Sequence, residues 1–317
     1  MRSYGWLLIC AVLSACAAPP RENLPRVTPR SDWAQWPRGT EVGQVSAVDV
    51  DSHGHVFVLH RPGRDWSEPF SSNPILVPVA AMFDRSGRLL KEWGADQTTM
   101  PHGLSVAPDD SIWITDDQRE QLLHFSHDGR LLQTLGERSV SGNTATRFGG
   151  PTDVAATPDA LFVSDGYINN RVIRIGRTTT WWGEKAGTDA GFAVPHSVAI
   201  RNGRLAVADR EYSRVKIYDL TGRLLAIYPQ RGHPYAAKWL PDGRLVVLEG
   251  RDPRGYEGAV LRLLGQDGKL QRSIDLTQGE NTTRGHDLAI GPDGTIYIAD
   301  VTGRRVLTVP LSALTRG

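Results

Sequence analysis

The chain has 317 residues, of which 36 are Lys or Arg and 35 are Asp or Glu, so its formal net charge is +1. This balance argues against a general nucleic-acid binder, which normally carries a basic excess or a basic patch. Hydrophobic residues make up 40% of the chain and charged residues 22%, which are ordinary globular values. The 33 Gly and 20 Pro residues are scattered as turn signals, a pattern typical of many short strands and not of disorder.

The first sixteen residues predict an export signal. Arg2 is followed by the apolar stretch GWLLICAVL from Gly5, which is too short to span a bilayer. The residues LSAC, which end at Cys16, resemble the lipobox of bacterial lipoproteins, where the Cys is acylated after cleavage. The alternative is an ordinary secretory signal cut after Ala15 or Ala18. Both interpretations export the chain.

The lipobox implies a mature protein anchored in the cell envelope by a lipid on Cys16. Ala17 is not the Asp that retains lipoproteins in the inner membrane, so in a Gram-negative cell we expect the outer membrane, facing the periplasm. Residues 17–32 are rich in Pro and Arg and predict a flexible tether. No later segment approaches the ~18 consecutive apolar residues of a spanning helix. No cysteine follows Cys16, so the remainder can form neither a disulfide nor a thiolate metal site.

From residue 46 onward one phrase recurs. It reads apolar strand, short turn often made by Asp-Gly or Asn-Gly, apolar strand often ending in Asp, polar turn and third strand. The copies are SAVDVDSHGHVFVLH from Ser46, PHGLSVAPDDSIWITD from Pro101, PTDVAATPDALFVSD from Pro151, PHSVAIRNGRLAVAD from Pro195, YAAKWLPDGRLVVLE from Tyr235 and GHDLAIGPDGTIYIAD from Gly285.

The spacing of the repeat predicts the fold. The equivalent positions follow one another at intervals of 56, 50, 44, 39 and 51 residues and are Ser46, His102, Thr152, His196, Tyr235 and His286. Units of roughly 40–50 residues with four short strands are typical of propeller blades. We therefore predict one all-β domain over residues 33–317, a six-bladed β-propeller. The last unit has three clear strands, and residues 33–42 are expected to supply the fourth, since an open ring would expose edge strands.

A second pattern accompanies the repeat. An Asp that ends the second strand of a unit is followed five or six residues later by an Arg, in the pairs Asp165/Arg171, Asp209/Arg214 and Asp300/Arg305. This pattern resembles the NHL repeat. We interpret the pairs as ion pairs that stabilise a turn within a blade, so they indicate the fold and say little about function.

Three histidines occupy one position of the repeat. The first strand of each blade lines the channel of a propeller, and His102, His196 and His286 stand at the equivalent position of units 2, 4 and 6. Alternate blades of six lie a third of a turn apart, so these imidazoles should converge on the axis. Three neutral imidazoles with an open fourth position make a catalytic zinc site, although copper, iron or nickel also bind imidazole. The other histidines do not share this position; they are His53, His55, His60, His124, His127 and His233.

Longer motifs give the chain a resemblance to a known family. They are LHRPGRDW from Leu59, PHGLS from Pro101, PTDVAATPDALFVSDGYINNR from Pro151, VPHS from Val194, VADRE from Val207 and GHD from Gly285. Over nearly all of residues 45–310 the chain resembles the peptidyl-α-hydroxyglycine α-amidating lyases. That family cleaves the N–C bond of a carbinolamide, R–CO–NH–CH(OH)–COO⁻, to a primary amide and glyoxylate.

The resemblance implies particular site residues. It assigns zinc to His102, His196 and His286, a structural calcium to Asp287 and the backbone oxygens of Val48 and Leu104, catalytic roles to Tyr167 and Arg61, and a place in the same pocket to Arg210. Tyr167 is expected to take the hydroxyl proton, as a phenolate favoured by zinc and an Arg. Arg61, with Arg210 as a second candidate, is expected to pair with substrate charge. Arg284-Gly285 stands where the family has Met-Pro, so Arg284 is a further candidate for substrate contact.

Two other functions compete with a metal-dependent lyase. A non-catalytic propeller of the NHL type would bind a peptide, glycan or protein at the envelope, because a fold alone does not set function. A hydrolase or lactonase of the related calcium propellers is disfavoured by the three histidines, because calcium prefers oxygen ligands. We expect the lyase, acting as a monomer on a small-molecule or peptide substrate, with no nucleic-acid partner.

Overall fold

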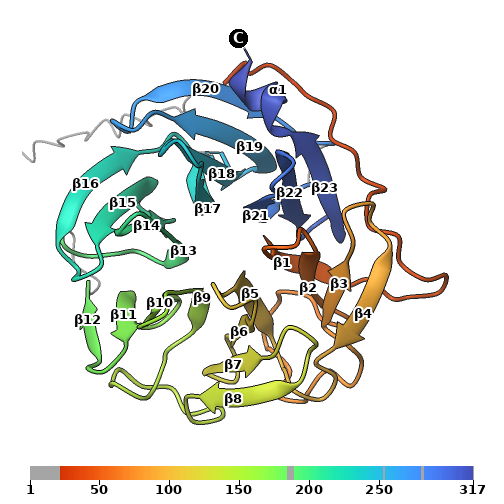
Figure 1. The fold of residues 1–317 in the computed structure, drawn as a ribbon, viewed down its shortest axis with the longest axis vertical. Helices are drawn as coiled ribbons and strands as arrows, with labels where there is room; N and C mark the ends of the chain where they lie inside the picture. Colours follow the sequence, from red (N-terminus) through yellow and green to blue (C-terminus); the bar gives the residue numbers. More distant parts are fainter. Residues whose placement is uncertain (1–21, 184–188, 253, 280–281, 317) are drawn as a thin grey trace, which may run out of the picture.

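The repeats form six antiparallel sheets, seen in the computed structural model, which describes residues 22–183, 189–252, 254–279 and 282–316. The sheets surround a central axis as blades (Figure 1), which confirms the predicted all-β six-bladed propeller. The expected export signal and Cys16 lie outside the described residues. Among the residues described, no helix is long and apolar enough to cross a membrane.

Five blades have four strands each, and the sixth has three. Blade 1 contains β1 (Gln44–Val50), β2 (Val56–Arg61), β3 (Ala80–Phe83) and β4 (Leu89–Trp93), and blade 2 contains β5 (Pro101–Val106), β6 (Ile112–Asp116), β7 (Gln121–Phe125) and β8 (Leu131–Leu135). Blade 3 contains β9 (Pro151–Ala156), β10 (Leu161–Asp165), β11 (Arg171–Ile175) and β12 (Thr180–Trp182), and blade 4 contains β13 (Pro195–Arg201), β14 (Arg204–Asp209), β15 (Arg214–Asp219) and β16 (Leu224–Pro229). Blade 5 contains β17 (His233–Trp239), β18 (Leu245–Arg251), β19 (Glu257–Leu264) and β20 (Leu270–Asp275), and blade 6 contains β21 (Gly285–Ile290), β22 (Thr295–Asp300) and β23 (Arg305–Pro310), followed by α1 (Leu311–Thr315).

The first strand of each blade lies next to the axis (Figure 1). The inner edge of such a sheet has no further strand beside it, so its backbone groups need other partners. Three aspartates supply them across blade boundaries. Asp287 Oδ2 accepts the N–H of Val48 at 3.1 Å, Asp49 Oδ2 that of Val106 at 2.9 Å, and Asp153 Oδ2 that of Val198 at 3.0 Å. These bonds join blade 6 to blade 1, blade 1 to blade 2, and blade 3 to blade 4.

The ring is closed by the N-terminal segment, but differently from the prediction. The expected fourth strand over residues 33–42 is wrong: Arg30 instead makes one antiparallel bridge to Thr308 of β23. Trp33 packs on Tyr297 of blade 6 and Phe83 of blade 1. The bridge at Arg30 and the buried indole of Trp33 therefore close the ring without a fourth strand. Apolar burial between the two blades does not require a continuous ladder of hydrogen bonds.

Trp33 also takes the place of an outer-strand aromatic. The turn glycines of blades 2 and 4, Gly129 and Gly222, lie against Trp93 and Trp182 on the outer strand of the preceding blade. Gly87 of blade 1 lies against Trp33, closest to its backbone oxygen and also near its ring. Residues 25–30, within the expected tether, hydrogen-bond to β20 and β23.

The predicted Asp–Arg pairs are ion pairs within blades. Arg171 Nε lies 2.8 Å from Asp165, and the corresponding distances are 2.7 Å for Arg214–Asp209 and 2.9 Å for Arg305–Asp300. In blade 3 both side chains are 0% exposed, and Arg171 also donates to two backbone carbonyls. Each aspartate additionally accepts a backbone N–H that precedes the inner strand of its blade. The pairs therefore tie the turn after the second strand to the start of the first.

Arg171→Met is expected to lower the free energy of unfolding by about 3–5 kcal/mol, because it leaves a buried carboxylate without its counter-charge. Urea unfolding followed by circular dichroism measures the change. Arg223→Met is the matched control: Arg223 pairs with Asp219 at 2.9 Å, but its side chain is 75% exposed, so little change is expected. Equal effects of the two substitutions would contradict a structural role for the buried pair.

Candidate metal centre at the propeller axis

The three histidines of the repeat column meet at the axis. His102 on β5, His196 on β13 and His286 on β21 come from blades 2, 4 and 6. Their ring centroids are 4.7, 4.8 and 4.9 Å apart, and one ring nitrogen of each lies within 4.8 Å of the corresponding nitrogens of the others. The predicted convergence is therefore present as a nearly equilateral triangle of imidazoles.

The intervening blades fix how each imidazole is oriented. The Nδ1 atoms of His102, His196 and His286 lie 2.7–2.8 Å from the backbone oxygens of Thr152, Tyr235 and Ser46, respectively. These three acceptors are the remaining members of the same repeat column. A carbonyl oxygen can only accept, so each Nδ1 carries the proton and each Nε2 keeps a free lone pair. This carbonyl-to-imidazole arrangement is typical of metal-ligating histidines.

Burial keeps the three imidazoles neutral. It lowers the pKa of each well below its usual value, helped by the positive charge of Arg61. Neutral imidazole is the form that binds a metal ion. His196 Nε2 is buried and has no hydrogen-bond partner among the described residues. A buried acceptor of this kind is costly unless a cation or proton donor satisfies it, so the residues fit a metal ion at this point.

Tyr167 stands beside the triangle, where the resemblance predicted it. Its hydroxyl lies 2.9 Å from His102 Nε2 and donates to it, since Nδ1 of that ring already carries the proton. Just before Tyr167, the backbone at Gly166 packs closely against blade 4, where a Cβ on Gly166 would lie 2.2 Å from the Pro195 oxygen. Burial raises the pKa of Tyr167, and the neighbouring Arg210 opposes that rise.

Arg210 faces the same hydroxyl from blade 4. Its Nη1 lies 3.4 Å from the Tyr167 oxygen, and its guanidinium stacks over the rings of Tyr167 and Tyr235 at 5.4 and 5.1 Å. Burial by itself would lower the pKa of Arg210, but the phenol oxygens of the two tyrosines and the carboxylate of Glu211, 2.7 Å from its Nε, outweigh it and raise that pKa. Arg210 is therefore a permanent positive charge next to Tyr167.

Arg61 approaches from the end of β2 in blade 1. Its Nε donates to the Pro101 oxygen at 2.7 Å and its Nη1 to Gln44 Oε1 at 3.2 Å, while the buried Nη2 has no partner within the described part of the chain. Burial lowers its pKa to about 10, so it remains charged at neutral pH. Trp66 covers it at 5.0 Å and also packs on Tyr167. The two N–H bonds of Nη2 on this fixed cation are thus available to a bound anion.

Arg61 and Arg210 share a second repeat position. In each blade, this residue directly follows the second-strand residue that pairs with the residue just before the repeat column in the first strand. The same position holds Asp117 in blade 2. Burial raises the pKa of Asp117 to about 6, and a Cβ on Gly150 would touch both its Oδ1 and the Cβ of Tyr167. Neither Asp117 nor Trp66 was predicted as a site residue, although an alignment of this second repeat position would have found Asp117.

Arg284 and the expected calcium ligands have different surroundings. Arg284 pairs with Glu257 at 2.7 Å. Its positive charge contributes to the lowered pKa of Arg61 and to that of His286. Asp287 directs one oxygen to the N–H of Val48 and the other to the N–H of Leu288. The calcium set of Asp287, Val48 and Leu104 stays a prediction.

Lys238 lies close to the carboxylate of Asp287. Burial by itself would lower the pKa of Lys238, but Asp49, Asp287 and Asp153 raise it. The ammonium therefore offsets part of the negative charge that a calcium ion would need.

Fold and site together define the class of protein: a six-bladed β-propeller with a buried three-histidine centre, flanked by a tyrosine and two arginines, at one mouth of its channel. No protein-family model matches the chain. Its sequence is similar to peptidyl-glycine alpha-amidating monooxygenases A and B of Xenopus laevis, with 29% and 28% identity over 86% of this chain. The chain spans only 32% and 34% of the length of those two relatives.

Shorter relatives carry the name of the lyase. A Caenorhabditis elegans protein named "Probable peptidyl-alpha-hydroxyglycine alpha-amidating lyase" is 27% identical over 86% of this chain and 83% of its own length. Peptidyl-alpha-hydroxyglycine alpha-amidating lyase 1 of Drosophila melanogaster is 27% identical over 91% of this chain and 62% of its own length. The chain therefore has homologues among enzymes of this name, at low identity.

Solved propellers are similar in fold. A streptogramin B lyase has a TM-score of 0.59 at 16% identity, covering 85% of this chain and 94% of its own. A gluconolactonase from Xanthomonas campestris has a TM-score of 0.62 at 13% identity, covering 93% of this chain and 99% of its own. At such identities the likeness concerns the fold alone.

Proposed function

We propose that the protein is a metal-dependent carbon–nitrogen lyase of the peptidyl-α-hydroxyglycine α-amidating type, which cleaves a carbinolamide to a primary amide and glyoxylate. The observation that carries the proposal is the axial triangle of neutral, carbonyl-oriented imidazoles with the Tyr167 hydroxyl 2.9 Å from one of them. The named relatives support the reaction type.

His102, His196 and His286 would hold the metal ion through Nε2. We propose zinc, because three imidazoles with an open position are its usual catalytic ligand set. When bound, the ion supplies Lewis acidity that makes the substrate hydroxyl a better proton donor. A calcium ion at Asp287, Val48 and Leu104 belongs to the same proposal as a structural element.

The arginines would bind the substrate carboxylate and set its orientation. Arg61 offers the unpaired Nη2 described above, from a guanidinium fixed by Pro101 and Gln44. A fixed, desolvated guanidinium binds a carboxylate more strongly than an exposed one does. Arg284, which is paired with Glu257, would act at longer range on the charge of the pocket.

Tyr167 would take the hydroxyl proton at its phenolic oxygen. Arg210, 3.4 Å away, would stabilise the phenolate and offset part of the cost of burying it. As the proton leaves, the electron pair of the O–H bond forms the carbonyl of glyoxylate. The N–C bond breaks, and the electron pair of that bond stays on nitrogen. The nitrogen then takes up one proton to give the primary amide, so atoms and charge balance.

The test uses α-hydroxyhippurate, the benzoyl carbinolamide, with the zinc-loaded protein. We expect equal amounts of glyoxylate and benzamide, loss of both after chelation, and recovery when Zn²⁺ is added back. Hippurate, which lacks the hydroxyl, is the matched control and should give no glyoxylate. No release above background from the zinc-loaded protein would overturn the proposal.

We also propose that the protein acts outside the cytoplasm, tethered to the envelope through a lipid on Cys16, on a small-molecule or peptide substrate. The sequence features of the first sixteen residues support this location. Metabolic labelling with a palmitate analogue would detect the lipid, and Cys16→Ser would remove it. A non-catalytic binding propeller is the alternative, and it predicts partner binding that survives removal of the metal.

A further inference from the structure

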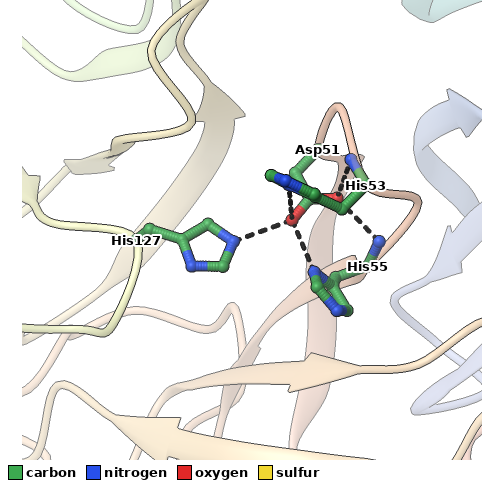
Figure 2. A group of neighbouring side chains, drawn as sticks. All are labelled: Asp51, His53, His55 and His127. Carbon is green, nitrogen blue, oxygen red and sulfur yellow. Dashed lines mark hydrogen bonds and ion pairs between the residues drawn. The ribbon is translucent and has the colours of Figure 1, made fainter.

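A second group of metal-ligating side chains lies away from the axis. Asp51, His53 and His55 stand in the turn between β1 and β2 of blade 1, and His127 stands in the turn between β7 and β8 of blade 2 (Figure 2). We refer to these four residues as the Asp51 cluster. The axial histidines lie near the opposite ends of the inner strands, so the cluster belongs to the other face of the propeller. None of its residues has a part in the proposed lyase reaction.

The cluster brings four donor atoms together. One ligand atom of each residue lies within 4.8 Å of those of the other three. Asp51 Oδ2 is 2.7 Å from His55 Nδ1 and 2.8 Å from His127 Nε2, while His53 Nδ1 lies at 3.9 Å, beyond hydrogen-bond distance. Gly54, at φ +85°, allows the sharp turn that sets His53 and His55 on either side of the carboxylate. Three imidazoles therefore surround one carboxylate oxygen (Figure 2).

The carboxylate at the centre is rigid and anionic. Its other oxygen, Oδ1, accepts the backbone N–H groups of His53 and His55 at 2.9 and 2.7 Å. Asp110 adds a second negative charge, 3.4 Å from His53 Nδ1. Two carboxylates therefore lie beside the imidazoles, with the guanidinium of Arg85 nearby, which donates to the His53 backbone oxygen at 2.8 Å.

The imidazoles can be reached from solvent. The side chains of His53, His55 and His127 are 66%, 31% and 35% exposed, whereas that of Asp51 is fully buried. Only two of the imidazoles hydrogen-bond to Asp51 Oδ2, whereas His53 Nδ1 lies 3.3 Å from Ser52 Oγ and 3.4 Å from Asp110. A metal ion among the four donors would use all of them, replacing the protons that His55 and His127 now donate to Asp51.

We propose that the Asp51 cluster binds a divalent transition-metal ion, for which three imidazole nitrogens and one carboxylate oxygen are the ligands. Zn²⁺ fits this four-ligand set best, and Ni²⁺ or Cu²⁺ would also be accepted. The four ligands leave no open position in a tetrahedral arrangement, so the role of the ion is structural. It would link blade 1 to blade 2 and stabilise the folded protein by binding it and not the unfolded chain.

The test is carried out in His196→Ala, which disables the axial centre. Equilibrium dialysis against Zn²⁺ is expected to give one ion per chain, and Zn²⁺ is expected to raise the melting temperature. Adding His127→Ala should weaken the remaining binding by more than about 100-fold, since losing a ligand costs more than the 10- to 100-fold cost of losing a second-shell partner. His53→Asn, at the most exposed ligand, is a second variant with little risk to folding.

His124→Ala is the matched control. His124 is also partly exposed and lies in the same blade as His127, but it stacks on Trp113 and bonds Ser111. It should leave the stoichiometry at one ion. Absence of Zn²⁺ binding in His196→Ala, or binding unaffected by both His127→Ala and His53→Asn, would overturn the proposal. Because the axial centre is disabled throughout, the outcome does not depend on whether the lyase activity is found.

Discussion

His196→Ala is expected to lower the bound metal by one ion per chain relative to the parent and to reduce glyoxylate release to the uncatalysed background. His196 supplies one of three neutral imidazoles, and its buried Nε2 has no hydrogen-bond partner among the described residues. Two imidazoles cannot hold a catalytic zinc with a defined open position. Elemental analysis of the dialysed protein, together with the glyoxylate assay, measures both effects.

The substitution also removes the hydrogen bond from Nδ1 to the Tyr235 oxygen, which leaves a buried carbonyl unpaired at a cost of about 1–3 kcal/mol. His196→Asn, whose amide can still donate, separates this loss from the loss of metal. Both variants should lack the ion, and circular dichroism should show both folded. Full activity in either folded variant would contradict a role for the axial centre.

Tyr167→Phe is expected to lower kcat by about 10²- to 10⁴-fold, the usual contribution of a positioned proton acceptor. The phenolic oxygen stands between His102 Nε2 at 2.9 Å and Arg210 Nη1 at 3.4 Å. The metal content and KM should change little, since the three ligands and Arg61 are untouched. Steady-state kinetics with α-hydroxyhippurate gives kcat and KM separately.

Tyr235→Phe is the matched control for this prediction. The Tyr235 ring packs on His196 at 4.9 Å and on Arg210 at 5.1 Å, so it shares the surroundings of Tyr167. Its backbone oxygen, which orients His196, is unaffected by the substitution. We expect a change in kcat of less than about tenfold. A Tyr167→Phe enzyme as active as Tyr235→Phe would remove Tyr167 from the reaction.

The axial centre could be predicted from the sequence because a propeller arranges the residues at one repeat position in a ring around its axis. His102, His196 and His286 are far apart along the chain, yet their equal place in the repeat was enough to bring them to one axis. The same reasoning explains the carbonyl partners, which occupy the alternate members of that column. The roles of Tyr167 and Arg61 rested on resemblance to a family, because a shared repeat position, such as the one that Arg61 has in common with Arg210 and Asp117, places a side chain without assigning its chemistry.

The Asp51 cluster could not be predicted in this way. Asp51, His53 and His55 lie in one turn, whereas His127 comes from a turn of the next blade and from a different place in the repeat. Whether such turns meet depends on the tilt of neighbouring blades and the lengths of their loops. These are decided by how the sheets pack and not by the period of the repeat.

The sequence by itself determined the strand alternation, the six units and the ring of axial histidines, because each follows from periodicity and a closed ring has only one arrangement of equivalent positions. Tertiary structure alone decided the contacts between positions that are not equivalent. Arg30 and Trp33 close the ring in place of a fourth strand, and His127 reaches Asp51. Such contacts depend on side-chain packing between blades, which carries no period for a sequence pattern to report.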